Sequence, residues 1–465
     1  MAFSVTSPMV RAATIPIPMS EVDAMEKMII IRRFITCLLS SGAFAATRSR
    51  RRERRIDPHQ PLTRRSARKE WQSVAARLTP PRYARRLRRP EPSEPMSLTI
   101  DSAELRLVRL PLVTPFTIST GTMTEKLFPL LTLRANGIEG YAEGVMDPLP
   151  DYLDESLPGA LALLRRVLIP GVLGRRLANP QAITPLIAPW RGHRMAIATL
   201  EMAVWDLWAK SLGLPLADVL GGAGDSVEVG VSLGIGPIDE TMNRIAAHLD
   251  QGYRRIKLKV KPGHDLALLR AARQEFPGAH LTADANSCYS LADTALLQQM
   301  DAFDLDYIEQ PLAWNDLHDH ATLQARLRTP ICLDESIRTV QDCRKALQTD
   351  AARVINIKVG RSGGYIESLR IHDLSAAFNV PVWCGGMLES GIGRAHNIHL
   401  STLPNFTKPG DVSSASRYFH RDIIEQKLET EAGHMGVPRE GAGIGVTLDR
   451  DFLKRVSDTP EEFRP

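Results

Sequence analysis

The pattern of apolar and polar residues predicts two kinds of segment in this chain. Residues 100–145 alternate between apolar and polar positions, as in Leu130–Leu133, which predicts a meander of β-strands. Met195–Leu212 instead carries apolar residues at helical spacing and ends before a Gly-Leu-Pro breaker. We therefore expect an α+β domain over residues 96–225.

Beyond residue 225, short β-branched runs alternate with amphipathic helical stretches. Such alternation predicts βα units with parallel strands, and so an α/β fold with a (β/α) barrel over residues 226–430. The expected strands lie in seven runs: Val227–Gly234, Arg254–Val260, His280–Asn286, Asp306–Leu312, Pro330–Ser336, Arg353–Val359 and Pro381–Gly386.

Five charged residues recur through these runs at a nearly constant interval. Lys259, Asp284, Glu309, Asp334 and Lys358 are separated by 25, 25, 25 and 24 residues. This period fits one strand and one helix with their loops. We expect the five side chains at the carboxyl ends of consecutive barrel strands, where barrel active sites form.

Two lysines share one face of the second expected strand. The strand period places Lys257 and Lys259 roughly 6–7 Å apart. A lone pair of this kind is typical of a solvated edge strand, but the neighbouring repeats favour a site. Crowding of two ammonium groups lowers a lysine pKa toward the range of a general base, so Lys259 is the expected base. Lys358 is expected across the barrel mouth, with the substrate between the lysines.

Three carboxylates are expected to converge on a cation. Asp284, Glu309 and Asp334 come from three successive strands, and they would repel one another unless a cation lay between them. A single Asp after a strand is more often a helix cap, but three in register favour a site. Oxygen ligands suit Mg2+, or another divalent cation such as Mn2+.

The order of these motifs resembles the enolase superfamily, in its muconate lactonising branch, across residues 98–450. The matching elements are KxK, DAN, EQP, DES and IKVGRSGG in family order. The segments Gly385–Asn397 and Pro409–Phe419 are similar to the o-succinylbenzoate synthase and N-succinylamino acid racemase subgroup. The resemblance implies a modified TIM (β/α) barrel, an amino-terminal capping domain over its mouth, and residues 431–465 returning to that domain.

The resemblance also implies a role for each site residue. It makes Lys259 the acid/base, Lys257 its electrostatic neighbour and Lys358 the opposite lysine, with Mg2+ on Asp284, Glu309 and Asp334. Asn286, Glu335 and Arg361 would support them. Contacts to a succinyl-bearing carboxylate substrate would come from Phe116, in the loop reaching Gly121, and from Ser232, Gly386, Met387 and Leu388. Purely structural roles are the alternative, a strand-end cap for Ser232 and a turn for the glycines.

Two reactions share the proton abstraction that these residues imply. The favoured one is the o-succinylbenzoate synthase reaction of menaquinone biosynthesis, in which 2-succinyl-6-hydroxy-2,4-cyclohexadiene-1-carboxylate loses water. The alternative is N-succinylamino acid racemisation by proton transfer between two faces. Dipeptide epimerisation fits less well, because the epimerase pattern has an acidic pair for the peptide ammonium group and Asp411-Val412-Ser413 offers one carboxylate. Muconate cycloisomerisation fits less well because the segment Gly385–Gly393 resembles that of muconate cycloisomerases less closely. A catalytically dead binding protein is disfavoured because no expected ligand or lysine is missing.

Basic residues are concentrated at the start of the chain. Residues 1–95 hold 20 of the 58 Lys and Arg residues but 8 of the 53 Asp and Glu residues, which leaves the rest at a net charge of −7. We expect a disordered Arg-rich leader, with translation starting at Met96. A nucleic-acid-binding tail is the non-enzyme alternative, disfavoured by the lack of interleaved aromatic residues.

The remaining composition favours a cytoplasmic enzyme. The apolar run Phe34–Ala46 is too short for a membrane span, and the arginines that follow argue against export. The five cysteines have no CxxC spacing, so neither a disulfide framework nor a zinc site is expected. A homo-oligomer is expected from the family resemblance.

Overall fold

The computed structural model describes residues 97–117 and 121–465, so the predicted leader and Met96 lie outside the described residues. The capping domain is built on an antiparallel sheet with strand order β16-β2-β3-β4. Its strands are β2 (Ser102–Thr117), β3 (Thr122–Ala135), β4 (Ile138–Glu143) and β16 (Glu461–Phe463). A pair of short strands, β1 (Leu98–Thr99) and β5 (Arg176–Leu177), lies beside this sheet.

Helices cover one face of this sheet. The longest is α6 (Arg194–Leu212), which contacts β3 and β4 and is buried along most of its length because it is apolar nearly all round. Gly213 ends it in a left-handed conformation. The smaller helices are α3 (Leu157–Leu163), η1 (Leu164–Leu168), α4 (Ile169–Val172), η2 (Pro180–Ile183), α5 (Thr184–Ile187) and α7 (Leu216–Leu220).

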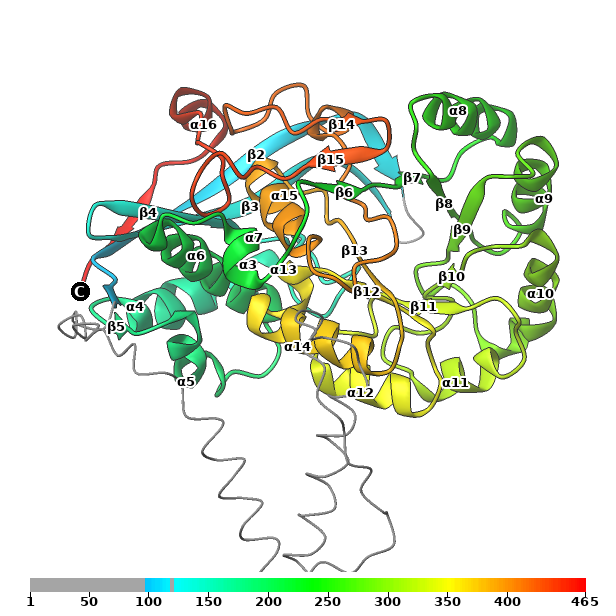
Figure 1. Cartoon of the computed structure of the whole chain (residues 1–465), viewed down its shortest axis with the longest axis horizontal. Coiled ribbons are helices and arrows are strands. Elements are labelled where there is room, and N and C mark those ends of the chain that lie inside the picture. Colours follow the sequence, from blue (N-terminus) through cyan, green and yellow to red (C-terminus); the bar gives the residue numbers. More distant parts are fainter. Residues whose placement is uncertain (1–96, 118–120) are drawn as a thin grey trace, which may run out of the picture. The chain divides into compact units, whose positions relative to one another are not determined.

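Seven parallel strands form the curled sheet of the barrel domain, in the sequential order β7 to β13. The strands are β7 (Val231–Leu233), β8 (Arg255–Lys259), β9 (His280–Asp284), β10 (Ile308–Glu309), β11 (Ile331–Leu333), β12 (Val354–Ile357) and β13 (Val382–Cys384). All seven lie within the predicted runs. Figure 1 shows helices α8 to α12 and α14 along the outside of this sheet.

The barrel helices follow their strands in the expected βα order. They are α8 (Ile238–Asp250), α9 (Leu266–Glu275), η3 (Leu291–Asp293), α10 (Thr294–Gln299), η4 (Met300–Phe303), α11 (His318–Gln324), α12 (Val340–Gln348), α13 (Val359–Ser362), α14 (Tyr365–Ala377), α15 (Gly391–Leu400) and η5 (Ala415–Arg417).

An irregular segment, residues 406–411, occupies the place between β13 and β7. Asp411 N donates to Cys384 O over 2.8 Å, and Gly230 N donates to Gly410 O over 2.8 Å. These bonds join the last strand of the sheet to the residues just before its first strand. The expected modified barrel is confirmed, with seven regular strands and one irregular connection.

The carboxyl-terminal residues contact both domains. The hairpin of β14 (Thr430–Glu431) and β15 (His434–Gly436) pairs with β6 (Ser226–Glu228). Helix α16 (Arg450–Val456) contacts β2, and β16 pairs antiparallel with the same strand. The domain boundaries at residues 225 and 430 stay predictions.

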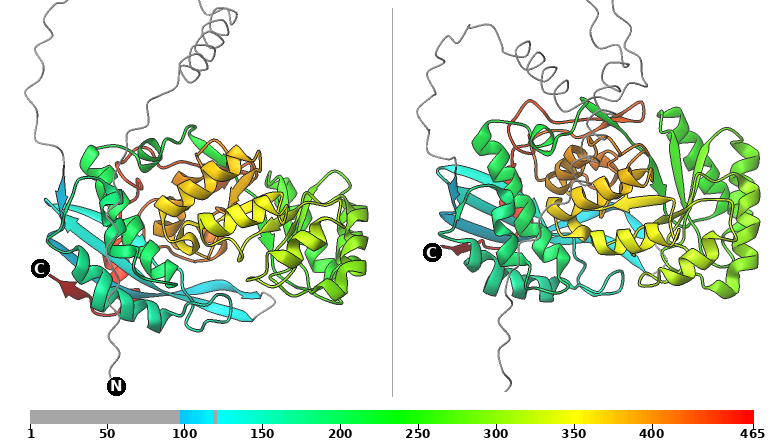
Figure 2. Two further views of the ribbon diagram at one scale, coloured as in Figure 1. Left: turned by 90° about the horizontal axis from the view of Figure 1, so that it is seen from below. Right: turned by 60° about the horizontal axis from the view of Figure 1, so that its bottom comes forward.

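Buried polar contacts join the capping domain to the barrel helices. Glu201 of α6 accepts hydrogen bonds from the backbone N–H groups of Tyr365 and Ile366, at the start of α14. Glu143 of β4 does the same at the start of α15, from Ser390 and Gly393. Each carboxylate meets N–H groups that have no partner within their own helix. The two views of Figure 2 show the long β2–β3 hairpin reaching from the capping sheet toward the barrel strands.

Two further findings bear on the class of protein. Within residues 97–117 and 121–465, no helix is both long enough and apolar enough to cross a bilayer. The four cysteines in this part of the chain, Cys288, Cys332, Cys343 and Cys384, are free.

Candidate active site

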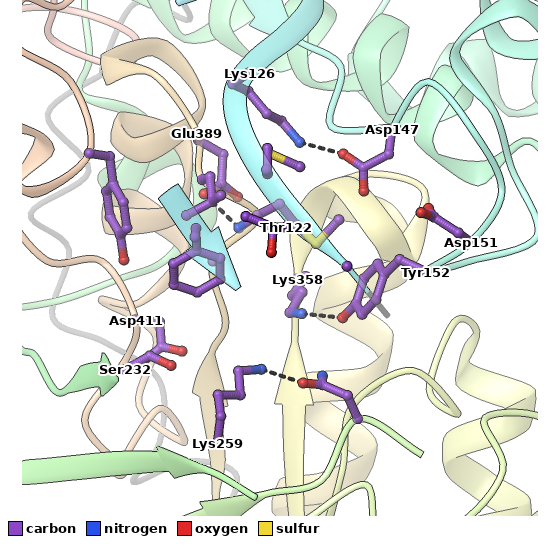
Figure 3. Close-up of a pocket in the computed structure, with 18 of the residues that line it drawn as sticks. Thr122, Lys126, Asp147, Asp151, Tyr152, Ser232, Lys259, Lys358, Glu389 and Asp411 are labelled. Atoms are coloured by element: carbon purple, nitrogen blue, oxygen red, sulfur yellow. Dashed lines mark hydrogen bonds and ion pairs between the residues drawn. The ribbon is translucent and has the colours of Figure 1, made fainter. Parts of the chain in front are cut away.

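Polar side chains from consecutive barrel strands line one cavity of about 380 Å3. The cavity lies between the carboxyl ends of the barrel strands and the capping domain, and Figure 3 shows residues of both. The barrel contributes charged groups that include Lys257, Lys259, Asp284 and Lys358. The apolar part of the wall includes Phe116 near the tip of the β2–β3 hairpin.

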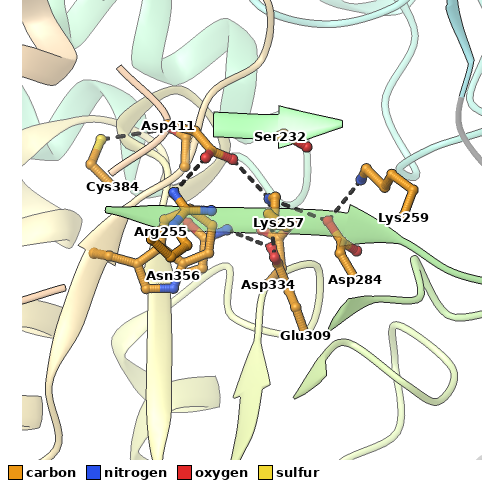
Figure 4. Close-up of polar contacts among 12 residues, drawn as sticks. Ser232, Arg255, Lys257, Lys259, Asp284, Glu309, Asp334, Asn356, Cys384 and Asp411 are labelled. Carbon is orange, nitrogen blue, oxygen red and sulfur yellow. Dashed lines mark hydrogen bonds and ion pairs between the residues drawn. The ribbon is translucent and has the colours of Figure 1, made fainter. Parts of the chain in front are cut away.

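Lys257 lies at the centre of a buried network of ion pairs (Figure 4). Its Nζ is 2.7 Å from Asp411, 3.0 Å from Glu309 and 3.2 Å from Asp284. Asp411 also pairs with Arg255 over 2.6 Å, and both cations lie beside the ring of Trp383. Lys257 is therefore surrounded by negative charge in a site with little access to water.

The carboxylates around Lys257 act on its pKa in the opposite direction to the crowding of two ammonium groups. Burial alone lowers the pKa of Lys257, but Asp411, Glu309 and Asp284 together outweigh it and raise the pKa well above its usual value. The sequence predicts two neighbouring ammonium groups, and the structure adds three carboxylates that compensate their charge. Lys257 is held as an ammonium group.

Lys259 is fixed by residues of the barrel. Its Nζ donates to Asp284 over 2.7 Å and to the Asn286 side-chain oxygen over 2.6 Å. Asn286 in turn donates to Glu335 over 2.9 Å. The register of β8 and β9 makes these contacts possible, because Lys259 is directly opposite Asp284.

Lys358 follows β12 and has partners from both domains. Its Nζ is 2.8 Å from Asp334 and donates to the Tyr152 hydroxyl over 2.8 Å. The Tyr152 hydroxyl donates to Asp334 over 3.1 Å. Arg361 also pairs with Asp334 and donates to the backbone oxygens of Asn356 and Ile337. Tyr152 belongs to the capping loop between β4 and α3, so the two domains meet at this lysine.

The carboxylates offer donor atoms that suit a hard cation. Glu309 is fully buried, and burial followed by repulsion from Asp284 raises its pKa. Among the described residues, Glu309 Oε2 and Asp334 Oδ1 are buried and meet the ion-pairing groups of Lys257 and Arg361, and Glu335 Oε2 is buried without a hydrogen-bond partner. Oxygens of this kind fit Mg2+ chemically.

The arrangement of the same carboxylates is one of ion pairs with lysine and arginine. Within the described ranges, no group of three or more His, Cys, Asp or Glu side chains is placed so as to hold a metal ion. Lys257 contacts two of the three predicted ligands, and Lys358 contacts the third. Ammonium groups therefore supply the positive charge that the three carboxylates require.

The expected substrate contacts lie around the same cavity. Ser232 of β7 has a buried hydroxyl that has no hydrogen-bond partner among the described residues, and the turn of Gly386, Met387 and Leu388 follows β13. Phe116 packs edge-on against Tyr418, with ring centroids 6.4 Å apart. The rings of Phe116 and Tyr418 give this wall a largely apolar surface.

Most of the predicted site residues come together at this cavity, and three lie behind it. Those that line it are Phe116, Ser232, Lys257, Lys259, Asp284, Asn286, Asp334, Lys358, Gly386, Met387 and Leu388. Glu309, Glu335 and Arg361 are in contact with lining residues instead.

Sequence reasoning missed several residues of the site. Arg394 lines the cavity and is nearly fully buried, with its guanidinium on the backbone oxygens of Ser413 and Glu389. Lys126 lines the capping side and pairs with Asp147 over 2.9 Å. Tyr152 and Asp411 were missed as partners of the lysines. None of these residues follows the strand period, so the repeat pattern carried no signal for them.

A barrel with an antiparallel capping domain, two lysines at one cavity and carboxylates at successive strand ends defines a class of enzymes that act on the proton beside a carboxylate. Residues 102–221 match the amino-terminal domain of mandelate racemase and muconate lactonizing enzyme, and residues 240–452 match the enolase carboxyl-terminal-like domain. The chain belongs to the enolase superfamily, within its o-succinylbenzoate synthase and N-succinylamino acid racemase group.

Individual relatives support this membership. The chain is 56% identical to an N-succinylamino acid racemase of Thermus thermophilus, over 77% of this chain and 98% of that racemase. It is 47% identical to an o-succinylbenzoate synthase of Geobacillus kaustophilus, over 79% of this chain and 98% of the synthase. A solved enolase-superfamily structure from Listeria innocua has a TM-score of 0.77 and 41% identity, over 79% of this chain and 99% of that one.

Proposed function

We propose that the protein is an o-succinylbenzoate synthase that removes the proton alpha to the carboxylate of 2-succinyl-6-hydroxy-2,4-cyclohexadiene-1-carboxylate. The observation that carries the proposal is the contact of Lys259 and Lys358 with carboxylates of different strands at a single cavity. Relatives at 41–47% identity that bear the synthase name support the substrate.

Lys259 is the proposed acid/base. As a neutral amine it accepts the alpha proton, and the electron pair of the C–H bond moves into an enediolate. The resulting ammonium group returns that proton to the departing hydroxyl, so water leaves and the ring becomes aromatic. Lys257 remains charged throughout, because Asp411 and Glu309 hold it as an ammonium group. Its positive charge stabilises the negative charge of the enediolate.

Asp284, Glu309 and Asp334 are the proposed ligands of Mg2+. A proton-transfer group contributes roughly 10^2 to 10^4 in rate, so the enediolate also needs electrostatic stabilisation. Bound Mg2+ would supply positive charge at the substrate carboxylate. The three carboxylates must then exchange part of their lysine contacts for the cation.

A second candidate function is N-succinylamino acid racemisation. It is favoured by the presence of Lys358 as a second candidate base, and by 56% identity to the Thermus thermophilus racemase. One lysine removes the alpha proton, and the ammonium form of the other lysine delivers a proton to the opposite face. The two reactions share the first intermediate, so one site can support both.

Turnover on both substrates tests the proposal. Purified protein with Mg2+ is given the cyclohexadiene carboxylate, with aromatisation followed by absorbance, and N-succinylphenylalanine, with loss of optical rotation followed by polarimetry. Faster dehydration supports the synthase, and faster racemisation supports the second candidate. Turnover of neither substrate would overturn the substrate assignment.

The cellular setting follows from the same proposal. A synthase of this kind acts in menaquinone biosynthesis, and free cysteines fit a reducing cytoplasm. We also propose a homo-oligomer that has a small carboxylate as substrate and neither nucleic acid nor membrane as partner.

A further inference from the structure

The loop between β4 and α3 is held at its beginning by the capping domain. Asp147 pairs with Lys126, whose side chain is only 2% exposed, over 2.9 Å. The backbone oxygen of Asp147 also accepts a hydrogen bond from Leu157 N over 2.8 Å, which brings the two ends of the loop together. These two contacts therefore fix where the loop begins and how far apart its two ends lie.

The far end of the loop is held by both domains. Asp154 pairs with Arg338 of the barrel over 2.7 Å. Glu155 accepts from the backbone N–H groups of Met195 and Ala196 at the start of α6, over 2.8 and 2.9 Å. Between these anchors the loop presents Tyr152 to the cavity, as Figure 3 shows.

Tyr152 contacts one of the two candidate bases. Its hydroxyl lies between Lys358 and Asp334, accepting from the first over 2.8 Å and donating to the second over 3.1 Å. The ammonium group of Lys358 is also 5.2 Å from the centroid of the Tyr152 ring. Lys358 is thus restrained from the barrel side by Asp334 and from the capping side by Tyr152.

Lys259 has no equivalent restraint from the capping domain among the described residues. The side chains that accept its hydrogen bonds, Asp284 and Asn286, both belong to the barrel. Within the described ranges, the two bases therefore differ in what holds them: the contacts of Lys259 come from the barrel, and those of Lys358 come from the barrel and the capping loop.

We propose that Tyr152 is a positioning residue for Lys358, and that it makes proton transfer on the Lys358 face depend on the capping loop while transfer on the Lys259 face does not. The inference rests on the proposed function. Loss of the Tyr152 hydroxyl then weakens racemisation, which needs both faces, more than dehydration, which needs Lys259.

The test measures alpha-proton exchange of each enantiomer of N-succinylphenylalanine in D2O with Mg2+, by proton NMR, together with inversion by chiral chromatography. Lys259→Ala and Lys358→Ala first identify which enantiomer faces which lysine. Tyr152→Phe should then slow exchange of the Lys358-facing enantiomer about tenfold, the effect of losing a hydrogen bond to a charged group. Exchange of the other enantiomer should change less than about twofold.

The Lys259-facing enantiomer gives a second readout, the ratio of exchange with retention to inversion. General loosening of the structure would not change this ratio. Lys259 still removes its proton in Tyr152→Phe, but delivery from Lys358 is impaired. Exchange with retention should therefore rise relative to inversion, by about the same tenfold. Tyr253→Phe is the control for loss of a buried tyrosine hydroxyl, because Tyr253 is buried and is not among the residues that line the cavity.

Asp154→Asn provides a second variant that leaves every cavity residue in place. It weakens the anchor to Arg338 at an exposed position and should shift the exchange ratio in the same direction by a smaller factor. Equal slowing of both enantiomers in Tyr152→Phe, or no change in either, would overturn the inference alone. If the unaltered protein exchanges neither enantiomer, the racemase function fails and the inference fails with it.

Discussion

Asp411 lies between two buried cations, 2.7 Å from Lys257 and 2.6 Å from Arg255. It comes from the irregular segment that occupies the gap between β13 and β7, whereas both cations come from β8. These two ion pairs therefore connect the irregular segment to β8, the second strand of the sheet. They also explain why Lys257 stays charged beneath the cavity.

Replacement of Asp411 by Asn should destabilise the protein. It leaves Lys257 and Arg255 buried without one of their negative partners, and breaking a buried pair in this way costs about 3–5 kcal/mol of unfolding free energy. Urea unfolding followed by circular dichroism measures the loss. Asp350→Asn is the control, because its pair with Arg353 is exposed and worth at most about 1 kcal/mol. Equal losses in the two variants would contradict the network.

Lys259→Ala should reduce both dehydration and racemisation by at least about 10^2 because it removes the proposed base. The fold should survive, since the change deletes a side chain at a cavity and leaves the backbone of β8 intact. Lys261→Ala, at an exposed lysine two residues further on, should have normal rates. Substantial turnover by Lys259→Ala would refute the assigned base.

Asp334→Asn should weaken Mg2+ binding and turnover together. The change removes one of three proposed negative ligands and also the carboxylate that Lys358 and Arg361 share. Isothermal titration calorimetry with Mg2+ measures affinity without reference to activity, and removal of the metal by a chelator should abolish turnover of the unaltered protein. An unchanged affinity would show that Asp334 is not a ligand.

The repeat pattern predicted the positions of the five strand-end residues because regular βα units fix where a strand ends. The register that sets Lys259 opposite Asp284 follows from the same regularity. Tyr152 is 206 residues from Lys358 and lies in a loop, so no periodicity links the two.

The electrostatics of the site depended on contacts that no local pattern contains. Burial lowers the pKa of Lys257, but nearby negative charges raise it by more. The first of these charges is Asp411, which is 154 residues away in the sequence. The repulsion between Lys257 and Lys259 follows from their spacing in one strand, whereas the attraction of Asp411 depends on the fold. Arg394 also reaches the cavity from α15, a helix that lies outside the repeat of strand-end residues.

Stability should fall below about pH 6 through His396. This side chain is fully buried, accepts from the Tyr365 hydroxyl and contacts Tyr141 O with its other ring nitrogen, and burial lowers its pKa to about 4. The unfolded chain takes up this proton near pH 6.5, so it binds more protons than the folded protein between these values. The free energy of unfolding therefore decreases as pH falls from 6.5 toward 4, by up to about 1.4 kcal/mol per pH unit.

Unfolding in urea at a series of pH values measures this slope. His396→Gln should flatten it, whereas His318→Gln, at an exposed position, should leave it unchanged. A slope that is the same in all three proteins would assign the acid sensitivity to other groups.

Gly385→Ala should reduce activity through the position of Lys358. A Cβ at Gly385 would lie 2.4 Å from Asn356 Oδ1 and 2.6 Å from Lys358 Cε, closer than atoms can approach. Asn356 and Lys358 must therefore move, and Asn356 donates to Glu309 over 3.0 Å. Racemisation should fall more than dehydration, by roughly tenfold or more, because a small displacement of a base is costly. Gly278→Ala is the control, since nothing lies within 4 Å of its added Cβ. If both activities fell equally, displacement of Asn356 and Glu309 would account for the loss. If neither activity fell, the cavity would have to tolerate a methyl group at a position where these distances exclude one.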